Sequence, residues 1–329
     1  CMTGDPGTLV MADAYLKGIR DFDIEKAYEI AMASARSLDE RNGQPFKNTR
    51  PQSKEYRERA YVANDLSSTV EYLLADYALS QLALALRKKD DYQFLSERVA
   101  RYSENYNESL GFMAPRDEAG AFLSAKDAYD TVGCIESNIY QQSMFVPYDV
   151  EGLAALFGRE RFLSLLEQLF DKADLAALWN ENYNHSNEPC HNLTHYFAML
   201  GHPERTQYWT RRVQKESYRL GAFGFCGNED VGQLSAWYVL SALGFAQVCV
   251  GSERFYLNTP LFRSAHILLD TKYHNCNLAP AFSVECDCDP LIYPFIDKMI
   301  LNGEELHRNY LTYDEITNGG RLVLKLKMK

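Results

Sequence analysis

Apolar positions in the first third of the chain recur at helical spacing. Between Met11 and about Arg36 the apolar side chains repeat every three or four residues on both sides of a polar break at Asp21–Asp23, which predicts two helices with a short joint. Ser67–Leu86 opens with Ser and Thr and is rich in Leu, Ala and Tyr, so it predicts a long helix. Tyr92–Tyr106 predicts another.

The middle of the chain continues this helical pattern after two irregular stretches. Asp39–Glu58 is polar and contains Pro45 and Pro51, which predicts a long ordered loop, and a turn follows at Gly111–Gly120. Helical spacing then returns in four segments, Val150–Lys172, Asn192–Leu200, Glu204–Tyr218 and Val231–Leu243. Because the joints are short, we expect antiparallel neighbours.

Beyond about Val250 the pattern changes to short β-type runs. These runs are Arg254–Leu257, Ala265–Leu269, Leu291–Phe295, Met299–Leu301 and Leu322–Lys327. Turn residues such as Asn302-Gly303 separate them, which predicts a small antiparallel sheet. The pattern therefore predicts a mainly α fold, with a helical domain over residues 1–250 and a β-rich region over residues 251–329.

Composition narrows the possible partners. The 329 residues are 46% hydrophobic, which suffices for a sizeable core, and the net charge of −11 makes a nucleic-acid partner unexpected. No apolar run reaches the length of a transmembrane helix, and the opening residues do not resemble a signal peptide. Eight cysteines lack paired zinc spacing, so we expect mostly buried thiols, and a disulfide can form if the protein is exported.

Three segments place charged and amide side chains among apolar, aromatic and Gly residues. They are Cys134–Asp149, Asn184–Asn192 and Gly227–Trp237. Glu136 has apolar and aromatic neighbours that would raise its pKa and keep it a proton donor, whereas Asp230 precedes a predicted helix whose N–H groups would favour the base form. Such a pair suits glycoside hydrolysis. The alternatives are that Glu136 pairs with a surface Lys, and that Asn228 and Asp230 only cap the helix.

The oxygen-rich side chains of these segments favour a hard cation over zinc. His185 and His191 are six residues apart around Pro189, which is not the spacing of a helical zinc site. The amide and carboxylate oxygens that suit calcium better belong to Asn138, Gln141, Asn187 and Glu188. Aromatic residues such as Trp237 could stack on a sugar ring, although a core role is the ordinary fate of each.

In this order the three segments resemble the second half of glycoside hydrolase family 92. Glu136–Gln141 with Phe145–Gly152 is similar to the stretch around the family's general acid, and Asn187–His191 to its substrate loop. Gly227–Phe245 resembles the family's most recognisable motif. The similarity extends back to Ala12–Ile19 and forward to Phe262, so it covers essentially the whole chain.

This resemblance implies a partial (α/α)6 toroid and calcium-dependent, inverting hydrolysis of terminal α-linked mannose, with α-1,2 linkages expected. Glu136 would be the general acid and Asp230 the general base, with Asn228 where some relatives have a second Asp. The two carboxyl groups of an inverting enzyme lie roughly 6.5–9.5 Å apart. The implied substrate-binding residues are Asn187, Glu188, His191 and Trp237, and the implied Ca²⁺ ligands are Asn138 and Gln141.

The chain also departs from the family pattern. Ser137 and Ile139 stand where Gly and an aromatic residue are common, and Asn187 precedes Glu188 where α-1,2-selective members resemble a His-Glu pair. Nothing in the sequence corresponds to the family's N-terminal β-sandwich and first toroid helices, which we therefore expect as a missing partner domain. A truncated, non-catalytic glycan-binding remnant and a purely structural helical scaffold are the competing hypotheses. The resemblance implies a periplasmic or extracellular location.

Overall fold

The computed structural model describes residues 3–38, 40–41, 43–45, 49–51, 53–274 and 276–328. The chain divides into two compact units, unit 1 with residues Cys1–Arg161 and Val250–Ser252, and unit 2 with Phe162–Cys249 and Glu253–Lys329. This division falls inside a helix, and the boundary near residue 250 between a helical domain and a β-rich region stays a prediction. No helix within the described ranges is both long and apolar enough to cross a membrane.

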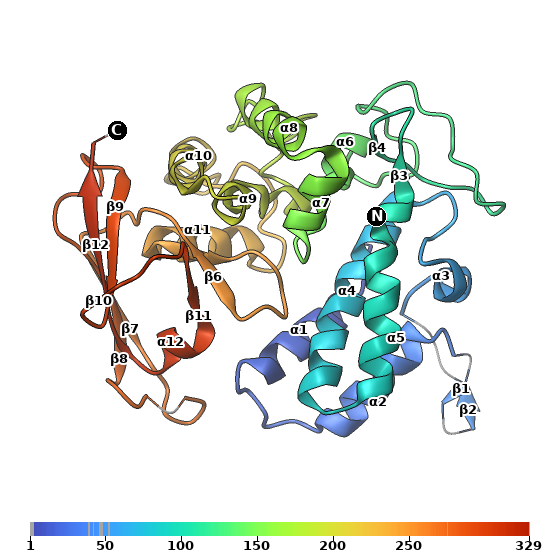
Figure 1. Cartoon of the computed structure of the whole chain (residues 1–329), viewed down its shortest axis with the longest axis horizontal. Coiled ribbons are helices and arrows are strands. Elements are labelled where there is room, and N and C mark those ends of the chain that lie inside the picture. Colours follow the sequence, from blue (N-terminus) through green and yellow to red (C-terminus); the bar gives the residue numbers. More distant parts are fainter. Residues whose placement is uncertain are drawn as a thin grey trace. The chain divides into compact units, whose positions relative to one another are not determined.

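Unit 1 is built from helices that pack around a long central one (Figure 1). They are α1 (Pro6–Leu16), α2 (Ile24–Ala35), α3 (Ser53–Arg59), α4 (Leu66–Ala85) and α5 (Lys89–Val99), the last followed by the 3₁₀ turn η1 (Ala100–Asn105). Asp65 caps α4 by accepting from the Ser68 N–H at 2.8 Å. Fifteen α4 residues are buried, because α1 and α5 both pack against this helix.

A buried group of charged side chains ties these helices together. The carboxylate of Asp76 on α4 is 0% exposed and accepts from Arg50 Nη1 at 2.7 Å and from Arg98 Nε at 2.6 Å. Tyr56 on α3 donates to the same carboxylate at 2.8 Å, and Arg50 also bonds Asp5 at the start of α1. Burial alone would raise the pKa of Asp76, but the two guanidinium groups lower it below its usual value.

The rest of unit 1 is largely irregular and ends in short helices. Strands β3 (Tyr106–Asn107) and β4 (Phe112–Met113) form a hairpin before the long stretch 114–138. Helices α6 (Ile139–Ser143) and α7 (Val150–Phe157) follow, and Ser143 Oγ on α6 accepts from the Met113 N–H of β4 at 3.0 Å. This bond anchors α6 to the hairpin.

Unit 2 combines helices with two sheets (Figure 1). The helices are α8 (Arg159–Asp171), η2 (Glu188–Cys190), α9 (Leu193–Met199), α10 (Pro203–Glu216), α11 (Gln233–Leu243) and α12 (Tyr313–Thr317). One sheet has the order β11-β6-β5, from β5 (Phe245–Gln247), β6 (Arg254–Leu257) and β11 (Tyr310–Thr312). The other has the order β10-β9-β12-β8-β7, from β7 (Ser264–Leu268), β8 (Ala281–Cys286), β9 (Phe295–Leu301), β10 (Glu304–Glu305) and β12 (Gly320–Lys327).

Several predicted elements are confirmed and several are wrong. The long helix at 67–86, the two helices before residue 36 and the change to strands after α11 are observed. The segment 39–58 is only partly described, and its end forms α3 instead of a loop. Gly158, with φ of 83°, splits the predicted helix 150–172 into α7 and α8. The sheet is mixed, because β12 pairs with β8 in parallel, and the apolar run 291–295 is not a strand before Phe295.

The cysteines behave as the sequence predicted. In the described part of the chain they are free thiols, and Cys190, Cys226, Cys249 and Cys286 are buried. Burial raises the pKa of Cys190 to about 12. A thiol in that state is an inert packing group at neutral pH.

Candidate active site

The segment predicted to hold the acid lies in unit 1 and is organised by a capping box. Asn138 Oδ1 accepts from the Gln141 N–H at 3.0 Å, and Gln141 Oε1 accepts from the Asn138 N–H at 3.2 Å, which starts α6. Both side chains are buried, and the neighbouring Gln142 Nε2 donates to Ser137 Oγ at 2.7 Å. Glu136 directly precedes this rigid turn.

Glu136 itself is exposed, which differs from the apolar surroundings that the sequence predicted. The burial begins one residue later, at Ser137. The backbone of Glu136 is left-handed, with φ of 52°, a conformation that costs a non-Gly residue about 1–3 kcal/mol and is often found at functional sites. The turn therefore presents the carboxylate to solvent while the following residues hold its backbone in place.

The predicted calcium ligands have a structural task of their own. Asn138 and Gln141 are neutral oxygen donors, which suit a hard cation, and the capping box uses one hydrogen bond to each amide oxygen. No cluster of three or more His, Cys, Asp or Glu side chains with metal-binding geometry lies in the described part of the chain. Two amides are only part of the six to eight oxygens that calcium takes. Their role as ligands stays a prediction.

The predicted substrate loop lies in unit 2 and rests on two buried histidines. His191 Nε2 donates to the His185 carbonyl at 2.9 Å, and Trp237 Nε1 on α11 donates to the His191 carbonyl at 3.1 Å. Burial lowers the pKa of His191 to about 4, and burial together with His191 lowers the pKa of His185 well below its usual value. Asn187 and Glu188, on the same loop, are partly exposed.

His191 and Trp237 are therefore less accessible than a substrate-binding role suggests. The exposed fraction is 2% for His191 and 6% for Trp237. Trp237 packs edge-on against the His185 ring, with 4.5 Å between the ring centroids, and stacks on Tyr218, with 6.0 Å between the ring centroids. In the described chain both residues support the loop, and their contact with a sugar stays a prediction.

The predicted base lies on a loop that touches the substrate loop. Gly227 allows this contact, because a Cβ placed there would meet the Ser186 Cβ at 2.4 Å. Asn228 and Asp230 are exposed, and Asp230 and Val231 are left-handed, with φ of 50° and 57°. Asn187, Glu188, Asn228 and Asp230 thus lie in unit 2, on two loops that meet at Ser186 and Gly227, whereas Glu136, Asn138 and Gln141 belong to unit 1.

The alternative that Asn228 and Asp230 only cap the helix is not what the structure shows. The N-cap of α11 is Gly232, which has no side chain to cap with. The side chain that bonds the first turn of α11 is that of Glu229. Its carboxylate accepts from the Ser235 N–H at 3.0 Å and from the Ser235 hydroxyl at 2.9 Å. Sequence reasoning overlooked Glu229, although an acidic residue just before a helix is a recognised signal.

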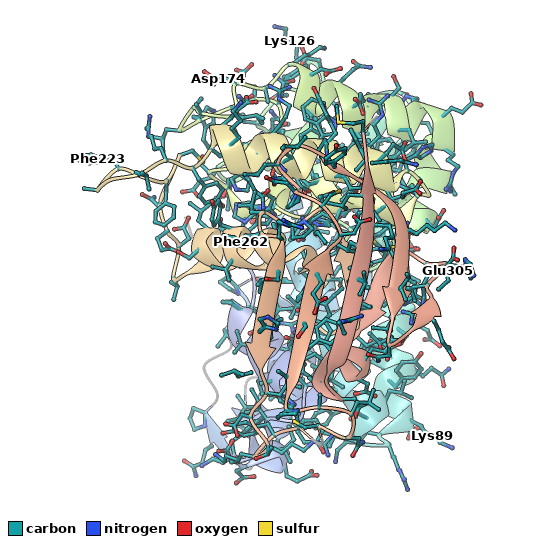
Figure 2. The ribbon with its side chains drawn as sticks, turned by 90° about the vertical axis from the view of Figure 1, so that its left-hand side faces the viewer. Lys89, Lys126, Asp174, Phe223, Phe262 and Glu305 are labelled. Atoms are coloured by element: carbon teal, nitrogen blue, oxygen red, sulfur yellow. The ribbon has the colours of Figure 1, made fainter. Side chains whose placement is uncertain are left out.

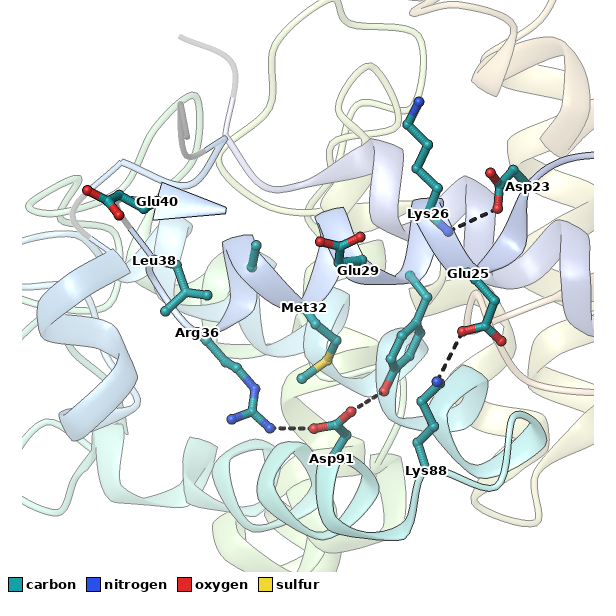
Figure 3. Close-up of a pocket in the computed structure, with 12 residues that line it drawn as sticks. Asp23, Glu25, Lys26, Glu29, Met32, Arg36, Leu38, Glu40, Lys88 and Asp91 are labelled. Atoms are coloured by element: carbon teal, nitrogen blue, oxygen red, sulfur yellow. Dashed lines mark hydrogen bonds and ion pairs between the residues drawn. The ribbon is translucent and has the colours of Figure 1, made fainter. Parts of the chain in front are cut away.

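A separate pocket contains none of the predicted site residues (Figure 3). It has a volume of about 650 Å³ and lies in unit 1 beside α2, with Tyr28 and Met32 among its lining residues. Four of its charged groups form two ion pairs, Arg36 with Asp91, and Lys88 with Glu25 at 3.1 Å. Tyr28 also donates to Asp91 at 2.7 Å.

Comparison with known proteins identifies the family of the chain. The model of the glycosyl hydrolase family 92 catalytic domain matches residues 1–328. The chain belongs to this family. A solved structure of a family GH92 α-mannosidase from Bacteroides thetaiotaomicron has 28% sequence identity and a TM-score of 0.88, covering 100% of this chain and 43% of that one. An inverting GH92 mannosidase from the same organism has 30% identity and a TM-score of 0.87, covering 100% and 46%.

A curated fungal relative is described as a glycosidase. An uncharacterised secreted glycosidase of Arthroderma benhamiae is 24% identical over 377 residues, which cover 98% of this chain and 45% of the relative. The chain therefore spans less than half the length of the proteins it matches.

Proposed function

We propose that the chain is the catalytic portion of an exo-acting α-mannosidase that releases terminal α-linked mannose with inversion. The observation that carries this proposal is the exposure of Glu136 and Asp230, each on a left-handed residue of a motif that the family match includes. Relatives support the substrate class, since one B. thetaiotaomicron α-mannosidase was solved in complex with mannoimidazole. We propose α-1,2-linked mannose as the linkage.

In this proposal the two carboxyl groups have separate tasks. Glu136 protonates the oxygen of the leaving group, and Asp230 takes a proton from the water that attacks the anomeric carbon from the opposite face. Asn228, beside Asp230, orients that water. Asn187 and Glu188 hydrogen-bond the sugar, with His191 and Trp237 behind them.

We also propose Ca²⁺ as the cofactor, with the Asn138 and Gln141 amides as two of its oxygen ligands. A bound calcium ion supplies Lewis-acid stabilisation and a template for vicinal hydroxyls. What this chain contributes is the capping box, which fixes the spacing of the two amides before any ion arrives. Chelation should therefore lower activity without unfolding α6.

The remainder of the proposal concerns the whole protein. We infer that the helices form part of an (α/α)6 toroid, completed by an N-terminal portion of the same protein that this chain does not include. A mannose-containing glycan is the partner, and the location is periplasmic or extracellular, as the name of the secreted fungal relative suggests. The second candidate is a glycan-binding remnant without turnover, which the coverage of less than half of each relative keeps open.

The test is release of free mannose from α-mannobiose isomers, with and without a calcium chelator, by this chain and by a form extended at the N-terminus. We expect Glu136→Gln to lower kcat about 10²- to 10⁴-fold on mannobiose, and less on aryl mannosides whose leaving groups need no proton. Glu108→Gln, at an exposed carboxylate of unit 1 outside the motif, is the matched control. Sugar binding without release by either form would favour the remnant.

A further inference from the structure

The hydroxyl group of Tyr218 connects three parts of unit 2. It lies 2.8 Å from His185 Nε2 and 2.9 Å from the carbonyl oxygen of Leu234, in the first turn of α11. A carbonyl only accepts, so the hydroxyl donates to Leu234 and accepts from a protonated His185 Nε2. His185 Nδ1 is then unprotonated and accepts from the Tyr183 hydroxyl at 2.7 Å. These contacts therefore fix the position of each proton in the hydrogen bonds that link Tyr183, His185, Tyr218 and Leu234.

The same turn of α11 carries the backbone of the proposed base. The Leu234 N–H donates to the Glu229 carbonyl and the Gln233 N–H to the Asp230 carbonyl, both at 3.3 Å. Leu234 is thus bonded on one side to the loop of Asp230 and on the other to Tyr218. A second tie reaches this turn from the substrate loop, because Gln233 Nε2 donates to His191 Nδ1 at 3.3 Å.

This loop needs such support. Asp230, Val231 and Gly232 have consecutive positive φ angles of 50°, 57° and 95°, and a β-branched residue such as Val231 rarely adopts one. Val231 is fully exposed, so its side chain packs on nothing that would hold this conformation. The backbone bonds to the first turn of α11, together with the bonds of the Glu229 carboxylate to Ser235, therefore hold the backbone of Asp230.

We propose that Tyr218 is a positioning residue, whose hydroxyl fixes the first turn of α11 and thereby holds Asp230 in place to act as the base. This proposal rests on the proposed function. The ring of Tyr218 has a separate packing role, since it stacks on Trp237 and contacts Tyr238 at 4.7 Å. Burial raises the pKa of Tyr218, so the hydroxyl stays a donor at neutral pH.

A matched pair of variants separates positioning from simple stability. Tyr218→Phe and Tyr183→Phe each remove one hydroxyl from the same imidazole, but only Tyr218 also reaches α11. In the form of the enzyme that releases mannose, we expect Tyr218→Phe to lower kcat at least tenfold with KM within twofold. Tyr183→Phe should keep kcat within twofold, whatever its effect on the melting temperature.

The leaving group distinguishes a displaced base from a disturbed acid. Attack by water needs Asp230 with every substrate, so Tyr218→Phe should lose the same factor on aryl mannosides as on mannobiose, unlike Glu136→Gln. An unchanged kcat, equal losses in the two tyrosine variants, or a loss that good leaving groups relieve would each overturn the proposal.

Amide hydrogen exchange provides a readout that does not need activity. The amides of Gln233 and Leu234 should exchange faster in Tyr218→Phe than in Tyr183→Phe, because only the first variant removes the bond of the Tyr218 hydroxyl to the Leu234 carbonyl. Equal exchange overturns the positioning. Faster exchange in Tyr218→Phe, with no release of mannose by the chain or by its extended form, would overturn the proposed function. The structural part of the proposal, that Tyr218 fixes the loop of Asp230, would still be supported.

Discussion

Three histidines of unit 2 occupy positions that only a neutral imidazole fills. His195 Nε2 lies 3.3 Å from Asn258 Oδ1, whose amide nitrogen donates to the Ser241 carbonyl, so the imidazole donates there. In the neutral ring His195 Nδ1 then accepts from the Thr194 hydroxyl at 3.0 Å, and that hydroxyl also lies 3.4 Å from the His191 carbonyl. A second ring proton would remove this acceptor, as it would in His185 and His191.

The stability of the chain should therefore fall with acidification below neutral pH. Burial lowers the pKa of His195 to about 4, although the bond to Asn258 opposes the shift, whereas an unfolded His has a pKa near 6.5. Between these values the unfolded chain binds the proton and the folded chain does not, so each such His removes up to about 1.4 kcal/mol of unfolding free energy per pH unit as the pH falls. Urea unfolding between pH 7 and pH 4.5 measures this slope.

Substitution isolates the contribution of one histidine. His195→Gln should show a shallower slope than the wild type, while His307→Gln, at an exposed position, should match it. A wild-type stability that does not change between pH 7 and pH 5 would contradict the argument.

Much of the candidate site was visible in the sequence at this scale, but its geometry was not. The side chains of Glu136 and Asp230 were predicted from their motifs. Their exposure and their left-handed backbones are set by the hydrogen bonds around them, such as the α6 capping box and the bond from the Gln233 N–H to the Asp230 carbonyl, and the prediction did not make use of these local bonds. Tyr218 carries no sequence signal, because its partners lie 33 and 16 residues away.

At the scale of elements, Gly227 allows the loop of Asp230 to approach the substrate loop at Ser186. We expect Gly227→Ala to lower the melting temperature and the activity together, because the new methyl group would overlap Ser186 and push the substrate loop away from the loop of Asp230. Gly7→Ala is the control, since nothing lies within 4 Å of a Cβ there and an exposed helical Gly is about 1 kcal/mol worse than Ala. Thermal unfolding should show opposite shifts, and equal shifts would refute the overlap.

Elements with local causes were predicted best. Helix α4 has its own cap and a continuous apolar pattern, and it was found within one residue at each end. The parallel pair of β8 and β12 was missed because their partners are separated by more than 30 residues. Leu291 and Ile292 were misread as part of a strand, yet both are exposed in a turn after Pro290.

At the scale of the whole molecule, unit 2 exposes large apolar side chains on neighbouring loops. Two contacts join these loops. Ser217 Oγ donates to the Leu175 carbonyl at 2.6 Å, and Gly227 lies against Ser186. Leu178, Trp179, Leu220, Phe223 and Val231 are at least half exposed on these loops. Figure 2 shows Phe223 at the tip of one loop, pointing away from the helices. We call these five residues the loop patch.

The isolated chain should therefore bind a fluorescent apolar dye and self-associate. Phe223→Ser is expected to lower both without lowering the melting temperature, since Phe223 is 86% exposed. Val10→Ser, at an exposed position of α1, should leave both unchanged. If the N-terminal extension is the partner that we propose, it should suppress dye binding as well. Equal dye binding by Phe223→Ser and the parent chain would contradict the role of the loop patch.

The buried Asp76 group also limits the order in which mutations can accumulate. Replacing Asp76 alone would leave Arg98 as an uncompensated charge in the core and Arg50 with Asp5 as its remaining carboxylate, at a cost of about 3–5 kcal/mol. That is a large share of the 5–15 kcal/mol that typically holds a domain folded. Replacing all of its charged members by well-packed apolar residues can be neutral. We therefore expect related sequences either to keep all four charged residues or to have replaced all four. These residues are Asp5, Arg50, Asp76 and Arg98.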